Sequence, residues 1–168
     1  MPKTCDNKSV GVIIRRGDKF AVIKRANFPV SYAMVAGHLD GDTFTNAAVK
    51  EAREEARVEV TKLAELLSQK FENPCKRRGG SWHEWKIYEA TEWNGELRAS
   101  SDAAEAFWAT ADELKKLADR TLYFSAKLGI PIKELARFIP ASVFHEEWKK
   151  SPGLEAVWLL MLQRVGIL

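Results

Sequence analysis

Three glutamates that lie close together in the chain have the type and spacing to bind a divalent cation. Glu51, Glu54 and Glu55 occupy positions i, i+3 and i+4 of segment 43–57, which is rich in alanine and lacks glycine and proline, so it favours a helix. These offsets place the three carboxylates on one helix face. Carboxylates so close repel one another unless a cation lies among them, and Mg²⁺ is commonly bound by a few carboxylates together with substrate phosphates. The alternative is an ordinary solvated face, because basic residues are interleaved with the acidic ones.

The residues before this helix favour the cation-binding interpretation. Residues 32–36 are predicted to form a short strand. Gly37, Gly41 and Asp42 then form a tight polar loop that leads into the helix, which Thr43 can cap. A strand, a glycine loop and an acidic helix, in this order, are expected where the backbone must come close to a phosphate-bound metal ion.

This stretch resembles the signature of the Nudix hydrolases, in which a glycine, a glutamate, an Arg-Glu pair, a Glu-Glu pair, a second glycine and an apolar residue follow at fixed spacing. The corresponding residues here are Gly37, Asp42, Lys50, Glu51, Glu54, Glu55, Arg57 and Val58. The resemblance implies that Glu51, Glu54 and Glu55 bind Mg²⁺ or Mn²⁺, joined by the carbonyl group of Gly37. It also implies catalytic roles for Glu54 and Glu51, with Glu54 at a position often given to the general base. Some members use a later acid, and the candidates for that role, each of which also fits a plain surface acid, are Glu84, Asp102 and Glu105.

The match departs from the family pattern at four points. The first spacer, residues 38–41, is one residue short, and Asp42, Lys50 and Arg57 replace Glu, Arg and Gly. In the family the first glutamate and the arginine form a salt bridge, so we expect a structural brace between Asp42 and Lys50, looser because lysine is a point charge. Arg57 is expected in a left-handed conformation, at a cost of about 1 kcal/mol.

The expected fold is α+β, an α/β/α sandwich of the Nudix type with a mixed sheet flanked by helices. Of the 168 residues, 1–120 are assigned to a Nudix-like hydrolase domain and 121–168 to a helical C-terminal extension packed on the same domain. A homodimer surface is the alternative use of that extension. Strands are expected at 9–14, 19–24, 32–36, 58–72, 82–93 and 106–109, with a turn at Asn94-Gly95 and a returning strand at 96–99. Helices are expected at 110–118, 122–128, 132–138 and 143–149, with a last one opened by Ser151-Pro152.

Basic and aromatic residues outside the signature could contact a phosphorylated substrate. Loop 73–80 carries consecutive basic residues, of which Arg77 and Arg78 could bind a distal phosphate, although a solubilising loop is an equal reading. The residues nominated to stack on a base are Phe28, Trp82 and Trp85, although most tryptophans should be packing residues. His38, in the signature loop, could touch phosphate.

The two cysteines, Cys5 and Cys75, are expected as free thiols. His83 together with Cys75 does not predict a zinc site, because partners at the usual spacing are missing.

The sequence therefore predicts a metal-dependent hydrolase that cleaves a pyrophosphate bond in a nucleoside diphosphate linked to another moiety, such as a nucleoside triphosphate, ADP-ribose or a nucleotide sugar. The alternative is a catalytically weakened nucleotide-binding sensor or interaction module. The net charge of +3 is mild, so we expect a phosphorylated, nucleotide-type small molecule as partner, rather than a nucleic acid or a membrane. Because no secretion signal or long apolar run is evident, the expected location is the cytoplasm.

Overall fold

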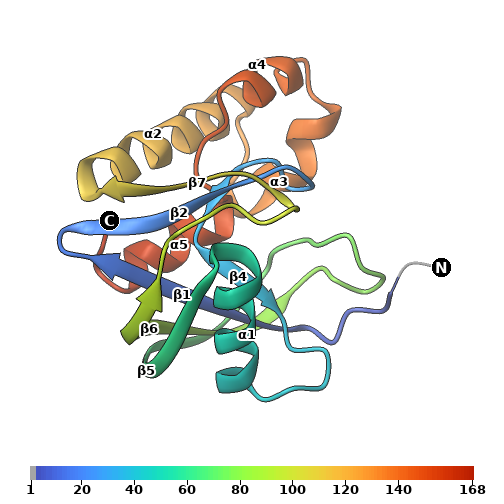
Figure 1. The fold of residues 1–168 in the computed structure, drawn as a ribbon. Helices are drawn as coiled ribbons and strands as arrows, with labels where there is room; N and C mark the ends of the chain where they lie inside the picture. Colours follow the sequence, from blue (N-terminus) through green and yellow to red (C-terminus); the bar gives the residue numbers. More distant parts are fainter. Residues whose placement is uncertain (1–2) are drawn as a thin grey trace.

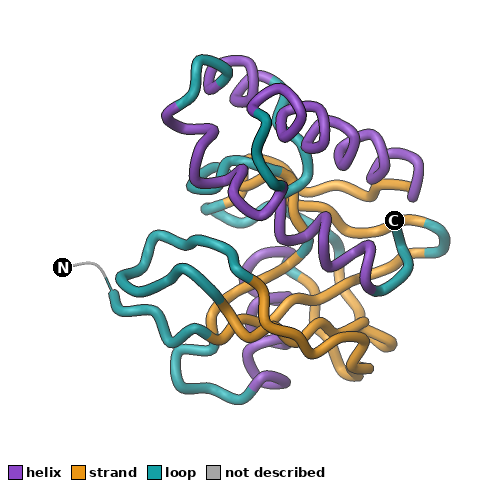
Figure 2. Tube along the Cα trace, turned by 180° about the vertical axis from the view of Figure 1, so that it is seen from behind, coloured by secondary structure: helices purple, strands orange, loops and turns teal. Residues whose placement is uncertain are grey.

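The computed structural model describes residues 3–168, in which seven strands form one mixed sheet between helices (Figures 1 and 2). The strands are β1 (Lys8–Arg16), β2 (Lys19–Arg25), β3 (Tyr32–Ala33), β4 (Val35–His38), β5 (Val58–Phe71), β6 (His83–Gly95) and β7 (Ala103–Thr110). The α-helices are α1 (Phe44–Ala56), α2 (Ala111–Leu128), α3 (Leu135–Phe138), α4 (His145–Lys150) and α5 (Ala156–Arg164), and short 3₁₀ turns flank α3. The expected mixed sheet flanked by helices is confirmed.

Strand β1 is at the centre of the sheet and positions the signature loop. It runs parallel to β6 and antiparallel to β4, and its last residues pair with β2. The register of β1 with β4 places Gly37 opposite Val10 and His38 opposite Ser9. The start of β1, the end of β4 and the start of β6 therefore meet at one edge of the molecule.

The two faces of the sheet are covered by different helices (Figure 1). Helix α1 packs its alanines, Ala48 and Ala52 among them, against Val10 and Val12. The opposite face carries Ile13 and is covered by α2 and α5. Trp158 of α5 packs directly on β1. The contact is so close that a Cβ atom added at Gly11 would lie 2.6 Å from Cη2 of Trp158. Helix α5 thus belongs to the main core of the domain.

Local sequence signals explain where the two longer helices begin and end. The Thr43 side chain accepts a hydrogen bond from the Asn46 amide at the start of α1, and Thr110 and Glu113 form a capping box at the start of α2. Arg57 ends α1 with φ of 61°, the left-handed conformation that the family pattern predicts at this position.

Several predicted elements are wrong. Residues 96–99 form no strand, because Asn94 and Gly95 do not form the expected turn: both continue β6 and pair with Glu59 and Val58 of β5. The helices expected at 110–118 and 122–128 are one continuous helix, α2, since no glycine or proline separates them. The last helix starts at Ala156 rather than at Pro152, because the backbone of Gly153 and Glu155 is hydrogen-bonded to Tyr32.

Among the helices within residues 3–168, none combines the length and the apolar character needed to cross a membrane.

Candidate active site

Two of the three signature glutamates press against the backbone of strand β4. An oxygen of Glu55 accepts a hydrogen bond from the amide of Ala36, at 3.0 Å between Oε2 and N. The carboxyl group of Glu51 lies against Gly37, since a Cβ at that position would be 2.1 Å from Glu51 Cδ. Gly37 is therefore required for its small size, because any side chain would displace Glu51.

These carboxylates face a cleft of about 300 Å³ that also contains basic groups. Its acidic residues are Asp40, Glu51, Glu55 and Glu155, and its basic residues are Arg25, Lys76 and Arg77. The cleft therefore combines what a bound metal ion needs with what the phosphates of a substrate need.

Burial and mutual repulsion make the two carboxylates hard to ionise. Burial, followed by repulsion from Glu55 and Glu54, raises the pKa of Glu51 to about 8. Burial raises the pKa of Glu55 to about 7, against the opposing effects of the Ala36 amide and Arg25. Within residues 3–168 neither carboxylate forms an ion pair with a basic side chain, and Arg25 pairs instead with Glu155, at 3.7 Å. Carboxyl oxygens without a basic partner fit a hard divalent cation, which would favour their ionised form when bound.

The rest of the predicted signature is arranged less tightly. Glu54 is exposed on α1 and, among the described residues, is not part of the cleft wall. The brace between Asp42 and Lys50 is not formed: both side chains are exposed, and no ion pair joins them in residues 3–168. Asp42 instead accepts a hydrogen bond from the Thr43 amide, at 2.8 Å. This hydrogen bond holds the shortened loop at the start of α1, in place of the predicted ion pair between the loop and the middle of the helix.

Of the later acids, Glu84, Asp102 and Glu105 are all exposed, and none lines this cleft in the described chain. Asp102 lines a separate hollow whose wall also includes Glu55. Glu105 pairs with Lys24, at 3.3 Å.

The predicted phosphate-binding residues divide between the cleft and the surface. Arg77 lies in the cleft and forms a two-pronged ion pair with Asp40, with 3.0 Å between Nη2 and Oδ2. Arg77 together with Lys3 holds the pKa of Asp40 well below its usual range. Arg78 is exposed and is not among the described residues of the cleft wall.

The nominated aromatic residues divide in the same way, because alternate residues of a strand face opposite sides. Phe28 and the buried Trp85 line the cleft. Trp82 is exposed on another surface, with the Lys70 ammonium 4.3 Å from its ring centre. Trp82 is therefore not placed to stack on a molecule in the cleft.

His38 lines the cleft and contacts a second histidine. Its Nε2 atom is 3.3 Å from that of His83. Burial, with added repulsion from Arg77 and His83, lowers the pKa of His38 to about 4, and burial lowers that of His83. Both rings are therefore neutral at pH 7 in this structure.

Sequence reasoning missed three charged residues of the cleft, Arg25, Asp40 and Glu155. Glu155 is buried, and its Oε2 atom has no hydrogen-bond partner. One sequence signal could have identified it, because it is the single charged residue in the apolar run 152–162. Arg25 ends strand β2 and carries no comparable signal.

Comparison with known proteins agrees with this arrangement. Residues 6–128 match the model of the NUDIX domain family. No curated protein matches the chain closely enough to count as a relative. Many solved structures share the fold.

A MutT NUDIX hydrolase from Burkholderia pseudomallei is 20% identical, with a TM-score of 0.56 over 64% of this chain and 84% of that one. A NUDIX hydrolase from Nitrosomonas europaea is 15% identical, with a TM-score of 0.52 over 89% of this chain and 92% of that one. The NUDIX domain of Shewanella oneidensis NrtR, solved with ADP ribose, is 13% identical, with a TM-score of 0.54 over 69% of this chain and 79% of that one.

The family match, the sheet with its glycine loop and the acidic helix together define the class of the protein. The chain belongs to the NUDIX family. At the level of that family it is a Nudix-type pyrophosphohydrolase.

Proposed function

We propose that this chain hydrolyses a pyrophosphate bond in a nucleoside diphosphate linked to another moiety, with Mg²⁺ or Mn²⁺ bound by Glu51, Glu54, Glu55 and the Gly37 carbonyl. One observation carries the proposal: two carboxylates without a basic partner are held against β4, in the same cleft as Arg25 and Arg77. A bound cation would offset their repulsion, and the arginines would bind phosphate oxygens.

In such a site, water attacks one phosphorus atom and the bridging P–O bond breaks, so that two phosphate-bearing products leave. A divalent cation, when bound, supplies Lewis-acid stabilisation of the phosphate charge and a more acidic water. We assign the water proton to Glu51 as the general base, since its carboxyl group lies in the wall of the cleft. Glu54, the other catalytic candidate, is then a metal ligand at the solvent edge.

A second cavity supports a substrate with an apolar or aromatic part. This cavity, of about 230 Å³, is lined mostly by apolar groups from loop 28–31, α3, α4 and residues 155–156. It shares Phe28, Pro29 and Glu155 with the cleft, and Trp148 fixes its wall by donating a hydrogen bond to the Val30 carbonyl, at 2.6 Å.

Two polar atoms in the wall of this cavity are buried without a hydrogen-bond partner, His145 Nδ1 and Glu155 Oε2. Buried polar atoms usually have a partner, so His145 Nδ1 can bind a polar atom of a ligand, whereas Glu155 Oε2 already lies 3.7 Å from Arg25 Nη1 in an ion pair. A nucleobase offers both a flat apolar face and hydrogen-bonding edges. We therefore place the base of the substrate in this cavity and its diphosphate in the cleft.

The test is turnover on a panel of nucleoside triphosphates, ADP-ribose, dinucleoside polyphosphates and nucleotide sugars, with Mg²⁺, with Mn²⁺ and with a chelator. Products are identified by chromatography. Variants Glu51→Gln and Glu55→Gln are compared with Glu92→Gln, a matched control at an exposed glutamate paired with Lys62 outside the cleft.

We expect turnover of at least one panel member, loss of turnover in chelator, and a fall of about 10²–10⁴-fold in Glu51→Gln. The control should keep the activity of the unmodified protein. Metal-dependent nucleotide binding without any turnover would instead identify a sensor. The absence of both turnover and nucleotide binding would refute the proposal.

A further inference from the structure

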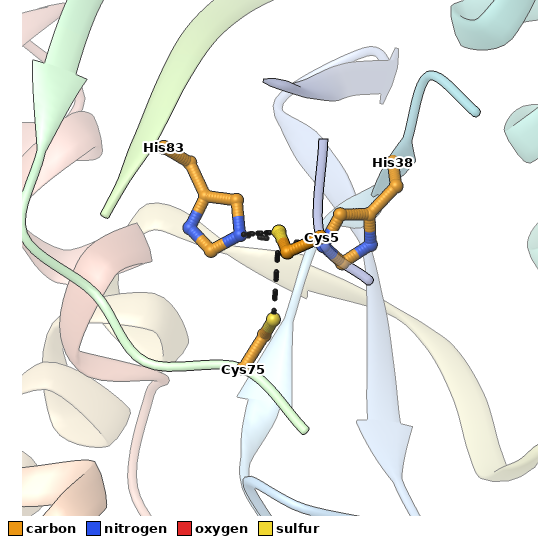
Figure 3. A group of neighbouring side chains, drawn as sticks. All are labelled: Cys5, His38, Cys75 and His83. Carbon is orange, nitrogen blue, oxygen red and sulfur yellow. Dashed lines mark hydrogen bonds between the residues drawn. The ribbon is translucent and has the colours of Figure 1, made fainter. Parts of the chain in front are cut away.

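Four side chains from four separate segments converge beside the cleft (Figure 3). Cys5 precedes β1, His38 ends β4, Cys75 lies in the loop between β5 and β6, and His83 begins β6. One potential ligand atom from each lies within 4.8 Å of all the others. The chain contains two cysteines and three histidines, so this cluster includes every one of them except His145.

From this cluster we infer a tetrahedral Zn²⁺ site with Cys5, His38, Cys75 and His83 as its ligands. Sequence spacing does not predict this site, because the ligands are far apart in the chain and lack the usual short spacing. A set of two thiolates and two imidazoles around one point is typical of structural zinc.

The distances between the ligand atoms agree with a tetrahedron around zinc. With Zn–S of about 2.3 Å and Zn–N of about 2.0–2.1 Å, the edges should be about 3.8 Å for S···S, about 3.3 Å for N···N and about 3.6 Å for S···N. The structure has 3.8 Å between the sulfurs of Cys5 and Cys75, and 3.3 Å between the Nε2 atoms of His38 and His83. The Cys5 sulfur lies 3.2 Å from His83 Nε2, slightly inside the expected edge.

The same sulfur–sulfur distance argues against a disulfide. A disulfide bond requires about 2.05 Å between the sulfur atoms. Both cysteines are free thiols in the structure. The two sulfurs are thus neighbours without being bonded, as two ligands of one ion would be.

The hydrogen bonds of His83 turn its metal-binding nitrogen toward the cluster. The indole nitrogen of Trp85 donates to Asn73 Oδ1, at 3.0 Å, which identifies that atom as the carbonyl oxygen. The same oxygen lies 3.1 Å from His83 Nδ1, so Nδ1 carries the proton. The Nε2 atom then has a free lone pair directed at the other three ligands. Such an outer hydrogen bond is the usual way of orienting a metal-bound histidine.

Backbone groups surround both sulfurs in a matching way. The Asn7 amide donates to the Cys5 sulfur at 3.3 Å, and the Arg77 amide donates to the Cys75 sulfur at 3.4 Å, each from two residues further along. Amide donors of this kind stabilise a thiolate. Gly80 completes the loop around Cys75, since a Cβ there would lie 2.1 Å from the sulfur.

A zinc ion here would join the N-terminal segment, β4 and the β5–β6 loop. The loop already pairs with the N-terminal segment, because the Cys5 amide donates to the Arg78 carbonyl at 2.9 Å. Asn73 and Arg77 of the same loop line the cleft. The ion would therefore be structural, and it would fix one wall of the cleft without taking part in the reaction.

The test uses the full-length, chelator-stripped and reduced protein, titrated with Co²⁺ and followed by absorption spectroscopy. The thiolate-to-cobalt charge-transfer band reports this site alone, because the glutamate site contains no sulfur. We expect this band together with the visible bands of tetrahedral Co²⁺. Zn²⁺ should displace the cobalt, and elemental mass spectrometry should then find about one equivalent of zinc per chain.

Variants Cys5→Ser and Cys75→Ser should each reduce the charge-transfer band and weaken metal binding at least about tenfold, and Asn73→Ala should weaken it about 10–100-fold. His145→Gln, which changes the histidine outside the cluster, and Glu51→Gln should leave the spectrum unchanged. Absence of the charge-transfer band in the unmodified protein would overturn the inference, whether or not a variant folds. The inference would also be overturned if protein prepared without reductant contained a Cys5–Cys75 disulfide and did not bind Zn²⁺ after that disulfide was reduced.

Discussion

Replacing Glu51 with glutamine should remove a large part of the pH dependence of stability in the metal-free protein. In the folded chain the pKa of Glu51 rises from its ordinary 4.5 to about 8, first through burial and then through repulsion from Glu55 and Glu54. The folded state therefore binds the proton more tightly than the unfolded state. This contribution to stability is complete below the unfolded pKa, declines as the pH rises, and is lost above the folded pKa of about 8.

The expected size follows from the same shift. At about 1.4 kcal/mol for each tenfold change in proton affinity, full burial would give an upper bound of about 5 kcal/mol. Because Glu51 is only half-buried, solvent screening reduces this to on the order of 2 kcal/mol. For a chain of this length, such a loss corresponds to a fall in Tm of about 4–8 °C.

The assay is thermal unfolding in chelator at pH 6 and pH 9, followed by circular dichroism. The fall in Tm between the two pH values should be smaller in Glu51→Gln than in the unmodified protein by roughly half of the amount given above, because pH 6 already lies above the unfolded pKa of 4.5. Glu92→Gln is the matched control, because Glu92 is exposed and pairs with Lys62 outside the cleft, and it should keep the fall of the unmodified protein. Equal falls in all three proteins would refute the argument that Glu51 is held in an uncompensated, buried position.

Backbone positions and metal binding provide the remaining predictions. Gly37→Ala should reduce kcat/KM by at least about 10²-fold, because the added Cβ displaces Glu51, and unchanged kinetics would contradict the tight approach. Arg57→Gly should raise the free energy of unfolding in urea by about 1 kcal/mol, since Arg57 has φ of 61°; a loss of stability would show that the arginine is not strained. Gly11→Ala should lower the same quantity by about 1–3 kcal/mol through contact with Trp158, and a neutral effect would contradict that packing. Mg²⁺ binding near pH 6.5 should release protons from Glu51 and Glu55, whose pKa values are about 8 and about 7, and the release should disappear by about pH 9; calorimetry in buffers of different ionisation enthalpy would detect either result.

Local sequence predicted the parts of the site that local structure determines. Helical spacing and the cap at Thr43 predicted α1, and the glycines before it predicted a tight loop leading into the helix. Strand alternation explains why His83 and Trp85 both lie on the buried side of β6. Each of these features depends on residues within a few positions of one another.

The parts that sequence could not predict depend on contacts between distant segments. The apolar cavity exists because loop 28–31 meets α3 and α4, which are more than a hundred residues later. The Cys5 and His38 side chains reach Cys75 and His83 only because β1 pairs with both β4 and β6. The prediction of a returning strand at 96–99 failed for the same reason, since the signal at Asn94-Gly95 carries no information that these two residues pair with Glu59 and Val58 of β5.

The most direct test of the central claim is a Mn²⁺ titration followed by electron paramagnetic resonance, in which the signal of free Mn²⁺ is lost on binding. The account predicts that the unmodified protein and Glu92→Gln bind Mn²⁺ alike, and that Glu55→Gln binds it at least about tenfold more weakly. Equal Mn²⁺ affinity in all three proteins would contradict the claim that the carboxylates of α1 hold the metal ion of this Nudix site.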